Sequence, residues 1–420
     1  MTAALATPAF PRAGLAGWSL FAGMIAAAGL PIYIHAPKFY VDSYGVSLAA
    51  LGGTLALLRL FDVVQDPVLG WLAERGRARR PLWVAVAAAS MALAMVGLFA
   101  VTPPIAPLVW FALTLSVLFT GFSFLTICFY AEGVGKAETL GPTGHLRLAG
   151  WREGGALIGV SLAAVAPVSL VGLTDTPFAV FAVGFAVVTL MATLAMRGQW
   201  KGVAGFDGPI FAAFRPALAD PLARRLLLIA LLNAAPVAVT STLFLFFVES
   251  RLQAAGAEGP LLLLFFLSAA ISTPLWSALA RRIGARTALL IGMALAIVAF
   301  LGAATLGAGD LWPFALICAA SGAALGADMT LLPAIFARRL AALGQGGESA
   351  AFGLWSFVSK LSLALAAATL LPTLSVAGFT PGAQNSAAAL ATLSLLYALV
   401  PCALKLLAIA LLAATRIPKE

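Results

Sequence analysis

Long apolar stretches recur along the whole chain and are separated by short polar connections. A helix needs about 20 apolar residues to cross the hydrocarbon core of a bilayer, so each stretch predicts one membrane-spanning helix. Twelve such stretches occur, at residues 14–35, 47–73, 82–101, 107–131, 151–172, 177–196, 224–248, 261–280, 287–306, 311–333, 350–374 and 388–415. The pattern therefore predicts an all-α integral membrane protein with 12 transmembrane helices.

The longest polar connection falls after the sixth stretch and predicts two six-helix bundles. The N-terminal bundle takes residues 1–205, a cytoplasmic linker takes 206–223 and the C-terminal bundle takes 224–420. The halves also share a repeat, because residues 67–75 resemble residues 274–282 at an offset of 207. Parallel six-span repeats are the arrangement of the major facilitator fold.

The charge of the chain follows its topology. Only 10% of the residues are charged, against roughly 25% in a soluble domain, and the net charge is +9. Twenty of the 25 Lys and Arg lie in the even-numbered connections and at the two ends, whereas two lie in the odd-numbered connections. This bias predicts a protein of the plasma (inner) membrane with both termini in the cytoplasm, and it makes the lipid bilayer, not nucleic acid, the partner of the basic residues.

Two acidic residues lie one helical turn apart in the middle of the second stretch. Asp62 and Asp66 share a helix face with Arg59. A carboxylate at the bilayer centre costs about 2.5–3.5 kcal/mol, so two are kept most easily where a positive ion visits them. Pro67 cannot bond to the carbonyl of Val63, which leaves that oxygen as a possible ligand for a hard cation. The segment predicts a cation site, occupied by Na⁺ or H⁺.

The second half of the repeat carries uncharged residues at the positions that match the two aspartates. Asp62 corresponds to Ala269 in the second half, and Asp66 corresponds to Thr273. Helix packing needs the small residues that both halves share, but it does not need charges that only one half carries. We therefore interpret the charges as functional.

A few further polar residues lie inside apolar stretches. Lys360 is too central to reach the membrane surface easily and is expected to have a functional or charge-pairing role, with one of the two aspartates as a candidate partner. Lys405 is interpreted as extending toward the cytoplasmic surface. Asp328 is assigned either a structural or a transport role. Asn233 and Thr240 either line a cavity as substrate-binding residues or join neighbouring helices.

The sequence offers no set of catalytic residues. The two histidines, His35 and His145, are far apart, and no nucleotide-binding loop occurs. We therefore expect no enzyme, no cofactor beyond the coupling ion, and no metal site except possible Na⁺ at the two aspartates. The function predicted is cation-coupled symport of a small solute by alternating access. The alternative is a proton-driven exporter of drug-like or amphipathic compounds on the same fold; an intramembrane enzyme or receptor is a third reading.

Two segments carry a resemblance to a known family. Residues 40–47 read Tyr-Val-Asp-Ser-Tyr-Gly-Val-Ser, and residues 59–71 contain an Asp-x-x-x-Asp-Pro-x-x-Gly core. The chain resembles the glycoside–pentoside–hexuronide cation symporters, the melibiose-permease-like branch of the major facilitators. This resemblance implies sodium- or proton-coupled symport.

The resemblance also implies roles for individual residues. It makes Asp62 and Asp66 cation ligands, with Ser123 as a weaker candidate. The residues implied in coupling or charge pairing are Arg59, Arg152 at the cytoplasmic end of the fifth span, and Lys360. Tyr130 falls where the family has a sugar-stacking aromatic.

The chain departs from the family at the substrate site. The two acids that hold sugar in the family appear here as Ala26 and Thr126, so a glycoside is not the expected substrate. An anionic or amphipathic small molecule is the rival. We expect a monomer that binds its substrate between the two bundles near the midplane.

Overall fold

The chain folds into helices connected by short loops. The computed structural model describes residues 13–417, except 201, 203–204, 345 and 382–383. The helices are α1 (Ala13–Ala27), α2 (Leu30–Tyr44), α3 (Leu48–Arg75), α4 (Arg80–Phe99), α5 (Pro107–Glu138), α6 (Gly144–Ser169), α7 (Pro177–Met196), α8 (Ile210–Ala219), α9 (Pro221–Phe246), α10 (Glu258–Ile283), α11 (Ala285–Ala303), α12 (Leu311–Leu343), α13 (Glu348–Val376) and α14 (Ala387–Ala414). A short helical turn, η1 (Gly76–Arg79), joins α3 to α4, and a π-helical turn, η2 (Phe247–Arg251), extends α9.

The predicted twelve spans correspond to these helices. Nine segments of the described residues are long and apolar enough to cross a membrane, and one of them, Ala50–Phe99, includes most of α3 and all of α4. The helix α6 and the α1–α2 pair complete the set. Many outward-facing side chains are apolar, as lipid contact requires; Leu162 and Leu190 are examples, 67% and 61% exposed.

The first span differs from the single helix expected over residues 14–35. It breaks after Ala27 into α1 and α2, which continues to Tyr44. Gly29 has a non-helical backbone (φ −89°, ψ −118°), and Pro31 stands in the first turn of α2. Proline has no N–H and fits a helix start, so the sequence Gly29-Leu30-Pro31 favours a break followed by a new helix.

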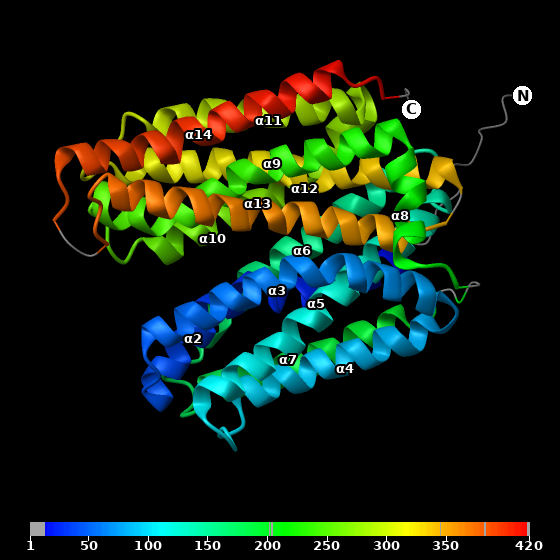
Figure 1. Cartoon of the computed structure of the whole chain (residues 1–420), viewed down its shortest axis with the longest axis horizontal. Helices are drawn as coiled ribbons and strands as arrows, with labels where there is room; N and C mark the ends of the chain where they lie inside the picture. Colours follow the sequence, from blue (N-terminus) through cyan, green and yellow to red (C-terminus); the bar gives the residue numbers. More distant parts are fainter. Residues whose placement is uncertain (1–12, 201, 203–204, 345, 382–383, 418–420) are drawn as a thin grey trace, which may run out of the picture.

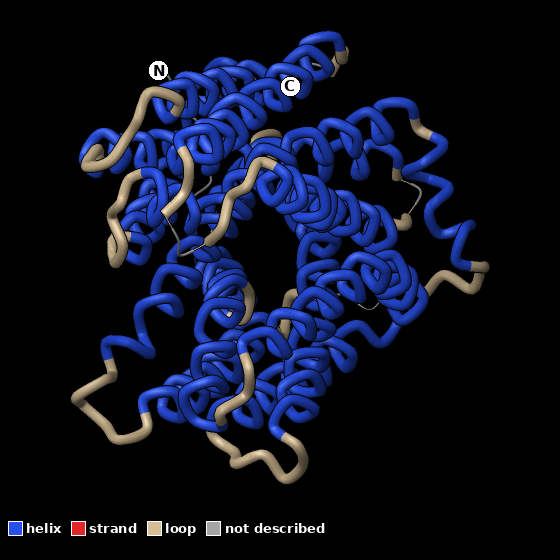
Figure 2. Tube along the Cα trace, turned by 60° about the vertical axis from the view of Figure 1, so that its left-hand side comes forward, coloured by secondary structure: helices blue, strands red, loops and turns tan. Residues whose placement is uncertain are grey.

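The helices form two halves, α1–α7 and α9–α14 (Figures 1 and 2). The short helix α8 lies within the connection that we assigned to the linker, residues 206–223. The halves meet mainly through two helix pairs, α3 with α13 and α6 with α10. Since α3 and α10 are the two copies of the repeat, the interface is pseudo-symmetric.

Small residues allow both of these pairs to approach closely. A Cβ on Gly70 of α3 would lie 3.0 Å from the Cα of Gly353 on α13. In the other pair, a Cβ on Gly150 of α6 would lie 2.7 Å from the Oγ of Ser277 on α10. Gly70 and Ser277 are matching positions of the repeat, so the small residues of the repeat pack the interface in both halves.

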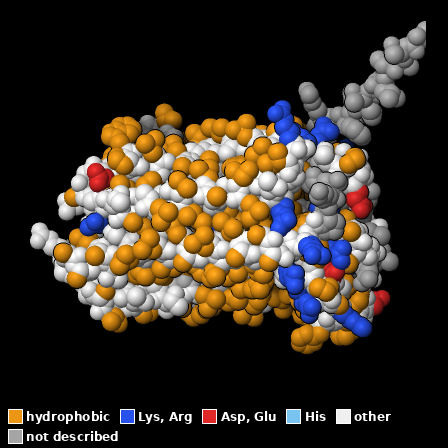
Figure 3. Space-filling view, turned by 90° about the horizontal axis from the view of Figure 1, so that it is seen from above, with side chains coloured by type: hydrophobic (Ala, Val, Ile, Leu, Met, Phe, Trp, Pro, Cys, Tyr) orange, Lys and Arg blue, Asp and Glu red, His pale blue; other side chains and the backbone are white. Residues whose placement is uncertain are grey.

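Lys and Arg gather at one end of the molecule, on the right in Figure 3. We call this the basic end. It contains η1 and the loops after α5, α7, α10 and α12, and α1 begins and α14 ends there. The opposite end, called the far end, contains the loops after α2, α4, α6, η2, α11 and α13. The basic end is the one that the charge bias assigns to the cytoplasm.

Candidate functional site

The candidate site lies where α3 and α5 of the first half meet α13 of the second. Asp66 on α3 is fully buried, and the Nζ of Lys360 on α13 lies 3.0 Å from its Oδ1. The same Nζ donates to the Oγ of Ser123 on α5 at 2.7 Å. The Oγ of Ser356 donates to the Oδ2 of Asp66 at 2.5 Å. Asp66 is therefore bound by the opposite half through two side chains.

The local sequence explains why the two helices meet so closely here. A Cβ on Gly353 would lie 2.9 Å from the carbonyl oxygen of Asp66, so only glycine allows this approach. Ser356 and Lys360 follow one and two turns later on α13, on the face that Gly353 presents to α3. The sequence had suggested Lys360 as a partner for one of the aspartates, and the structure brings it to Asp66.

Asp62 has different partners, although it lies only one turn away. It is 5% exposed, and its Oδ1 accepts a hydrogen bond from the Nε2 of Gln65 at 2.6 Å. The Oε1 of Gln65 accepts in turn from Thr120 on α5 at 2.9 Å. Arg59 lies half-buried one turn before Asp62. These partners of Asp62 belong to the first half, whereas Asp66 is bound from the second.

A second buried cluster joins α5 to α6. The Oε1 of Glu153 accepts hydrogen bonds from the Nε of Arg152 and from the hydroxyl of Tyr130, both at 2.7 Å. The guanidinium of Arg152 lies 3.7 Å from the centre of the Tyr130 ring. Phe352 of α13 packs against the same ring, with centroids 5.3 Å apart. One face of Tyr130 is thus covered by a cation in this structure.

Arg152 lies deeper than the sequence suggested, because α6 begins at Gly144 and not near residue 151. Glu153 was not among the predicted site residues, although it lies next to Arg152 in an apolar segment. Thr126 donates to the carbonyl of Phe122 in its own helix, and Ala26 lies half-buried near the end of α1. Neither position supplies a carboxylate where the related symporters have one.

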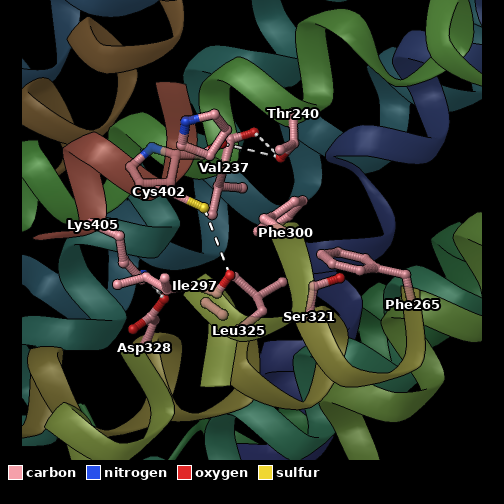
Figure 4. A pocket seen from close by; sticks show the side chains of 13 residues that line it. Val237, Thr240, Phe265, Ile297, Phe300, Ser321, Leu325, Asp328, Cys402 and Lys405 are labelled. Carbon is pink, nitrogen blue, oxygen red and sulfur yellow. Dashed lines mark hydrogen bonds and ion pairs between the residues drawn. The ribbon is translucent and has the colours of Figure 1, made fainter. Parts of the chain in front are cut away.

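The second half contains a buried polar cluster of its own (Figure 4). Lys405 on α14 is 2% exposed, and its Nζ donates to the Oδ1 of Asn233 on α9 at 2.6 Å and to Asp328 on α12. The expectation that Lys405 extends toward the surface is therefore wrong. The other oxygen of Asp328 is buried without a partner beside a cavity of about 20 Å³, room for about one water molecule. Thr240 lines this cavity and donates to the carbonyl of Pro236.

A network of charged residues joins the halves at the basic end. The carboxylate of Glu74 on α3 accepts from the backbone N–H of Ser349 at 3.0 Å, at the start of α13. Arg77 lies 3.0 Å from both Glu74 and Glu348. Arg80 donates to Ser349 at 2.6 Å and to Glu132 at 3.1 Å. These contacts, together with Asp66–Lys360, hold α3 to α13 from the basic end to the middle of the membrane.

Among the residues that the structure describes, no group of three or more His, Cys, Asp or Glu is arranged to hold a metal ion. The oxygens around the Asp66 carboxylate and the Lys360 ammonium group include two hydroxyls. Ser123 and Ser356 supply these hydroxyls within the same cluster.

Known proteins resemble this chain in sequence and in fold. It is 29% identical over 175 residues to the inner membrane symporter YicJ of Escherichia coli (strain K12), a match that covers 39% of this chain and 37% of that protein. The chain thus spans little more than a third of that relative.

Solved structures show the same fold at low sequence identity. One is a bacterial homologue of the iron transporter ferroportin in an outward-facing state, with a TM-score of 0.69 and 16% identity over 95% of this chain and 98% of that one. Another is a variant of the E. coli fucose:proton symporter FucP, with a TM-score of 0.69 and 14% identity over 96% of this chain and 98% of that one. These likenesses confirm the predicted major facilitator fold.

The family follows from a match along nearly the whole chain. Residues 15–419 match the family described as MFS/sugar transport protein. The predictions of a non-enzyme and of a multi-pass protein of the inner membrane are confirmed with it. The chain therefore belongs to the MFS/sugar transport proteins of the major facilitator superfamily.

Proposed function

We propose that this protein is a secondary transporter that couples the movement of a cation, Na⁺ or H⁺, to symport of a small solute. The observation that carries the proposal is the position of Lys360. Its ammonium group lies 3.0 Å from the Oδ1 of Asp66 and 2.7 Å from the Oγ of Ser123. This cluster of oxygens binds a positive charge that belongs to the chain itself, and an external cation can compete for the same oxygens.

Competition with Lys360 gives the cation a means of changing the conformation. When Na⁺ or H⁺ neutralises Asp66, the attraction that holds Lys360 of α13 to α3 is lost. The contacts between the halves that remain at this depth are packing and two neutral hydroxyls, those of Ser356 and Ser123. A ligand shifts a conformational equilibrium by its difference in affinity for the two states. The affinity of the Asp66 site for a cation differs between the two states, because Lys360 lies next to Asp66 only when α3 and α13 are together.

The basic end, which we propose faces the cytoplasm, is closed in this structure. The helices α3 and α13 are joined there through Glu74, Arg77 and Arg80. Toward the far end, a Cβ on Gly52 or Gly53 of α3 would meet nothing within 4 Å, so α3 does not pack against the second half at these positions. We therefore assign the structure to the outward-facing state of an alternating-access cycle.

The solute is expected between the halves, next to the buried cluster of Arg152, Glu153 and Tyr130. The family's sugar-binding acids are replaced by Ala26 and Thr126, and Arg152 already covers the Tyr130 ring. This supports a substrate other than a glycoside, with a carboxylate or another acceptor that can take over the guanidinium of Arg152 from Glu153. A monomer is sufficient for this mechanism, because one chain supplies both halves.

A ligand screen followed by transport tests the proposal. Purified protein is first heated with sugars, organic acids and peptides, with and without Na⁺, since a ligand that binds the folded state raises the melting temperature. The best compound is then followed into proteoliposomes under a Na⁺ or a pH gradient. The proposal requires accumulation that stops when the matching gradient is collapsed. Uptake that merely equilibrates, whatever the gradient, contradicts coupling.

A further inference from the structure

A groove runs along the side of the first half, between α3, α4 and α5. Its volume is about 760 Å³, which is within the size range of ligand sites. Its walls are mainly apolar, and they include Phe61 and Leu72 of α3, Trp83 and Val86 of α4, and Val117 and Phe124 of α5. The groove is lined by none of the residues of the Asp66–Lys360 cluster, which lies where α3 meets α13.

The groove opens toward the lipid. The side chains of Phe61, Trp83 and Val117 on its rim are 51%, 48% and 46% exposed, and they belong to membrane-spanning helices. From Phe61 to Gly76 the groove follows α3 for roughly 20 Å, at about 1.5 Å per residue. The hydrocarbon of one leaflet is about 15 Å thick, so the groove extends through one leaflet and ends at the membrane surface.

Two arginines close the groove at the basic end. Arg75 and Arg79 both line it and are both exposed. In the described part of the chain neither has a carboxylate partner, whereas the neighbouring Arg77 and Arg80 are paired with Glu348 and Glu132. Arg77 and Arg80 thus join helices, whereas Arg79 lines the groove without a charged partner among the described residues. Arg75 also lines the groove, and its guanidinium lies 5.4 Å from the centre of the Trp71 ring.

We propose that this groove binds an anionic phospholipid of the membrane. The phosphate contacts Arg75 and Arg79, because guanidinium groups bind phosphate oxygens in pairs. One acyl chain lies against the apolar walls between α3 and α4. Basic pockets between membrane helices on the cytoplasmic side have the charge that anionic headgroups require. A soluble anion would use the arginines but would leave the apolar walls uncovered.

The groove also touches the network of Asp62. Thr120 lines the groove and donates to Gln65, whose Nε2 donates to Asp62. An acyl chain in the groove therefore packs against a wall that positions one of the buried carboxylates of α3. The proposal does not depend on the identity of the coupling ion.

Native mass spectrometry of the full chain tests the headgroup. Phosphatidylglycerol and phosphatidylcholine of the same acyl chains are added in equal amounts, and bound lipid is counted. We expect retention of phosphatidylglycerol to exceed that of phosphatidylcholine, and to fall roughly tenfold in the double variant Arg75→Gln/Arg79→Gln. The matched control is Arg281→Gln/Arg282→Gln, which removes two exposed arginines at the basic end of α10 and should retain the lipid.

A second variant tests the acyl chain. Ser116→Trp places a large ring in the groove, whereas Val183→Trp places the same ring on the lipid-exposed surface of α7, where the side chain is 53% exposed. The first should reduce phosphatidylglycerol retention and the second should not. The proposal would be overturned if the two lipids bound equally, or if both arginine pairs lost the lipid equally. It would also be overturned if inorganic phosphate alone raised the melting temperature as much as phosphatidylglycerol does.

Discussion

Asp66 and Lys360 are 294 residues apart in the sequence, and their carboxylate and ammonium groups lie 3.0 Å apart across the two halves of the molecule. The carboxylate side chain is fully buried, and the lysine side chain is 16% exposed. Removing one partner of a buried ion pair costs more than removing both, because the remaining charge loses its compensation. The pair therefore predicts different results for single and double variants.

The first prediction concerns the two single variants. Lys360→Gln leaves a buried carboxylate and should lower stability by about 3–5 kcal/mol, whereas Asp66→Asn leaves an ammonium group that reaches some water and should cost less. Both should abolish gradient-driven accumulation, since one removes the cation ligand and the other its competitor. Thermal unfolding and uptake in proteoliposomes measure the two effects.

The double variant Asp66→Asn/Lys360→Gln separates stability from coupling. It should recover most of the lost stability without recovering accumulation. Asp42→Asn is the control, because its carboxylate pairs with Lys38 at the surface and is 57% exposed. Full accumulation in the Asp66→Asn variant would refute the role assigned to this residue.

The second prediction concerns the close approach of α3 and α13. In Gly353→Val the new Cβ would lie 2.9 Å from the Cα of Gly70, which costs about 1–3 kcal/mol where the helices touch. That cost disappears when the basic end opens, so the ratio of the open to the closed state should rise about 5- to 150-fold. Maleimide labelling of a cysteine placed at Ala350, which is fully buried here, reports this opening.

Gly52→Val, which places the same side chain on α3 toward the far end, is the control. A Cβ at Gly52 meets nothing within 4 Å, so the labelling of Ala350→Cys should remain low. The native cysteines are replaced beforehand. Equal labelling in the Gly353→Val and Gly52→Val backgrounds would show that the glycine contact does not hold the basic end closed.

The span pattern and the basic end could be predicted because both depend on local sequence. An apolar run of sufficient length has few alternatives to a transmembrane helix, and Lys and Arg in short loops report the topology. The break between α1 and α2 has a local signal too, in Gly29 and Pro31. The continuous apolar character of residues 14–35 nevertheless favours a single span. Helix ends are less determined by apolar character, so the start of α6 at Gly144 was placed too late.

The partners of buried charges could be predicted only in part. Lys360 was expected to meet a carboxylate because its central position left no route to water. The interpretation of Lys405 as a residue that reaches the surface is wrong, and the sequence contains the reason: Lys405 lies nine residues, or roughly 14 Å, from the end of α14 at Ala414. That distance exceeds the reach of a lysine side chain, and it was the signal that pointed to internal partners. Which partners they are depends on how α9 and α12 pack against α14, which the sequence does not specify.

The third prediction uses this correction. In Lys405→Met the carboxylate of Asp328 loses its cation, and its other oxygen already lacks a partner, so stability should fall by about 3–5 kcal/mol. Adding Asp328→Asn should restore much of it. A surface lysine would behave differently, since its replacement usually changes stability by less than about 0.5 kcal/mol. Thermal unfolding of the two variants distinguishes the cases, and a small effect of Lys405→Met would contradict the buried cluster.

The fourth prediction concerns pH and a residue outside the membrane spans. Asp220 precedes α9, where its Oδ1 accepts from the backbone N–H of Ala223 at 2.7 Å. Arg339 of α12 donates to the same carboxylate from its Nε at 2.9 Å and its Nη2 at 2.5 Å. The hydrogen bond from Arg339 lowers the pKa of Asp220 from its ordinary value, against an opposing effect of burial.

A lowered pKa fixes the sign of the pH dependence. The ion pair stabilises the folded state in full above the ordinary aspartate pKa of about 3.9, and the contribution is lost as the pH falls through the lower pKa of the folded state. Asp220→Asn keeps the helix cap but loses the ion pair, and because Arg339 is partly exposed the cost should be about 1 kcal/mol at pH 7. Asp220→Ala should cost about 1 kcal/mol more, since it also removes the cap.

Unfolding measured from pH 7 to pH 3 should show the difference in stability between wild type and Asp220→Asn shrinking in acid. The control is Asp207→Asn, at an exposed position. A difference that stays constant over this range would mean that the charge of Asp220 contributes nothing to joining α9 and α12.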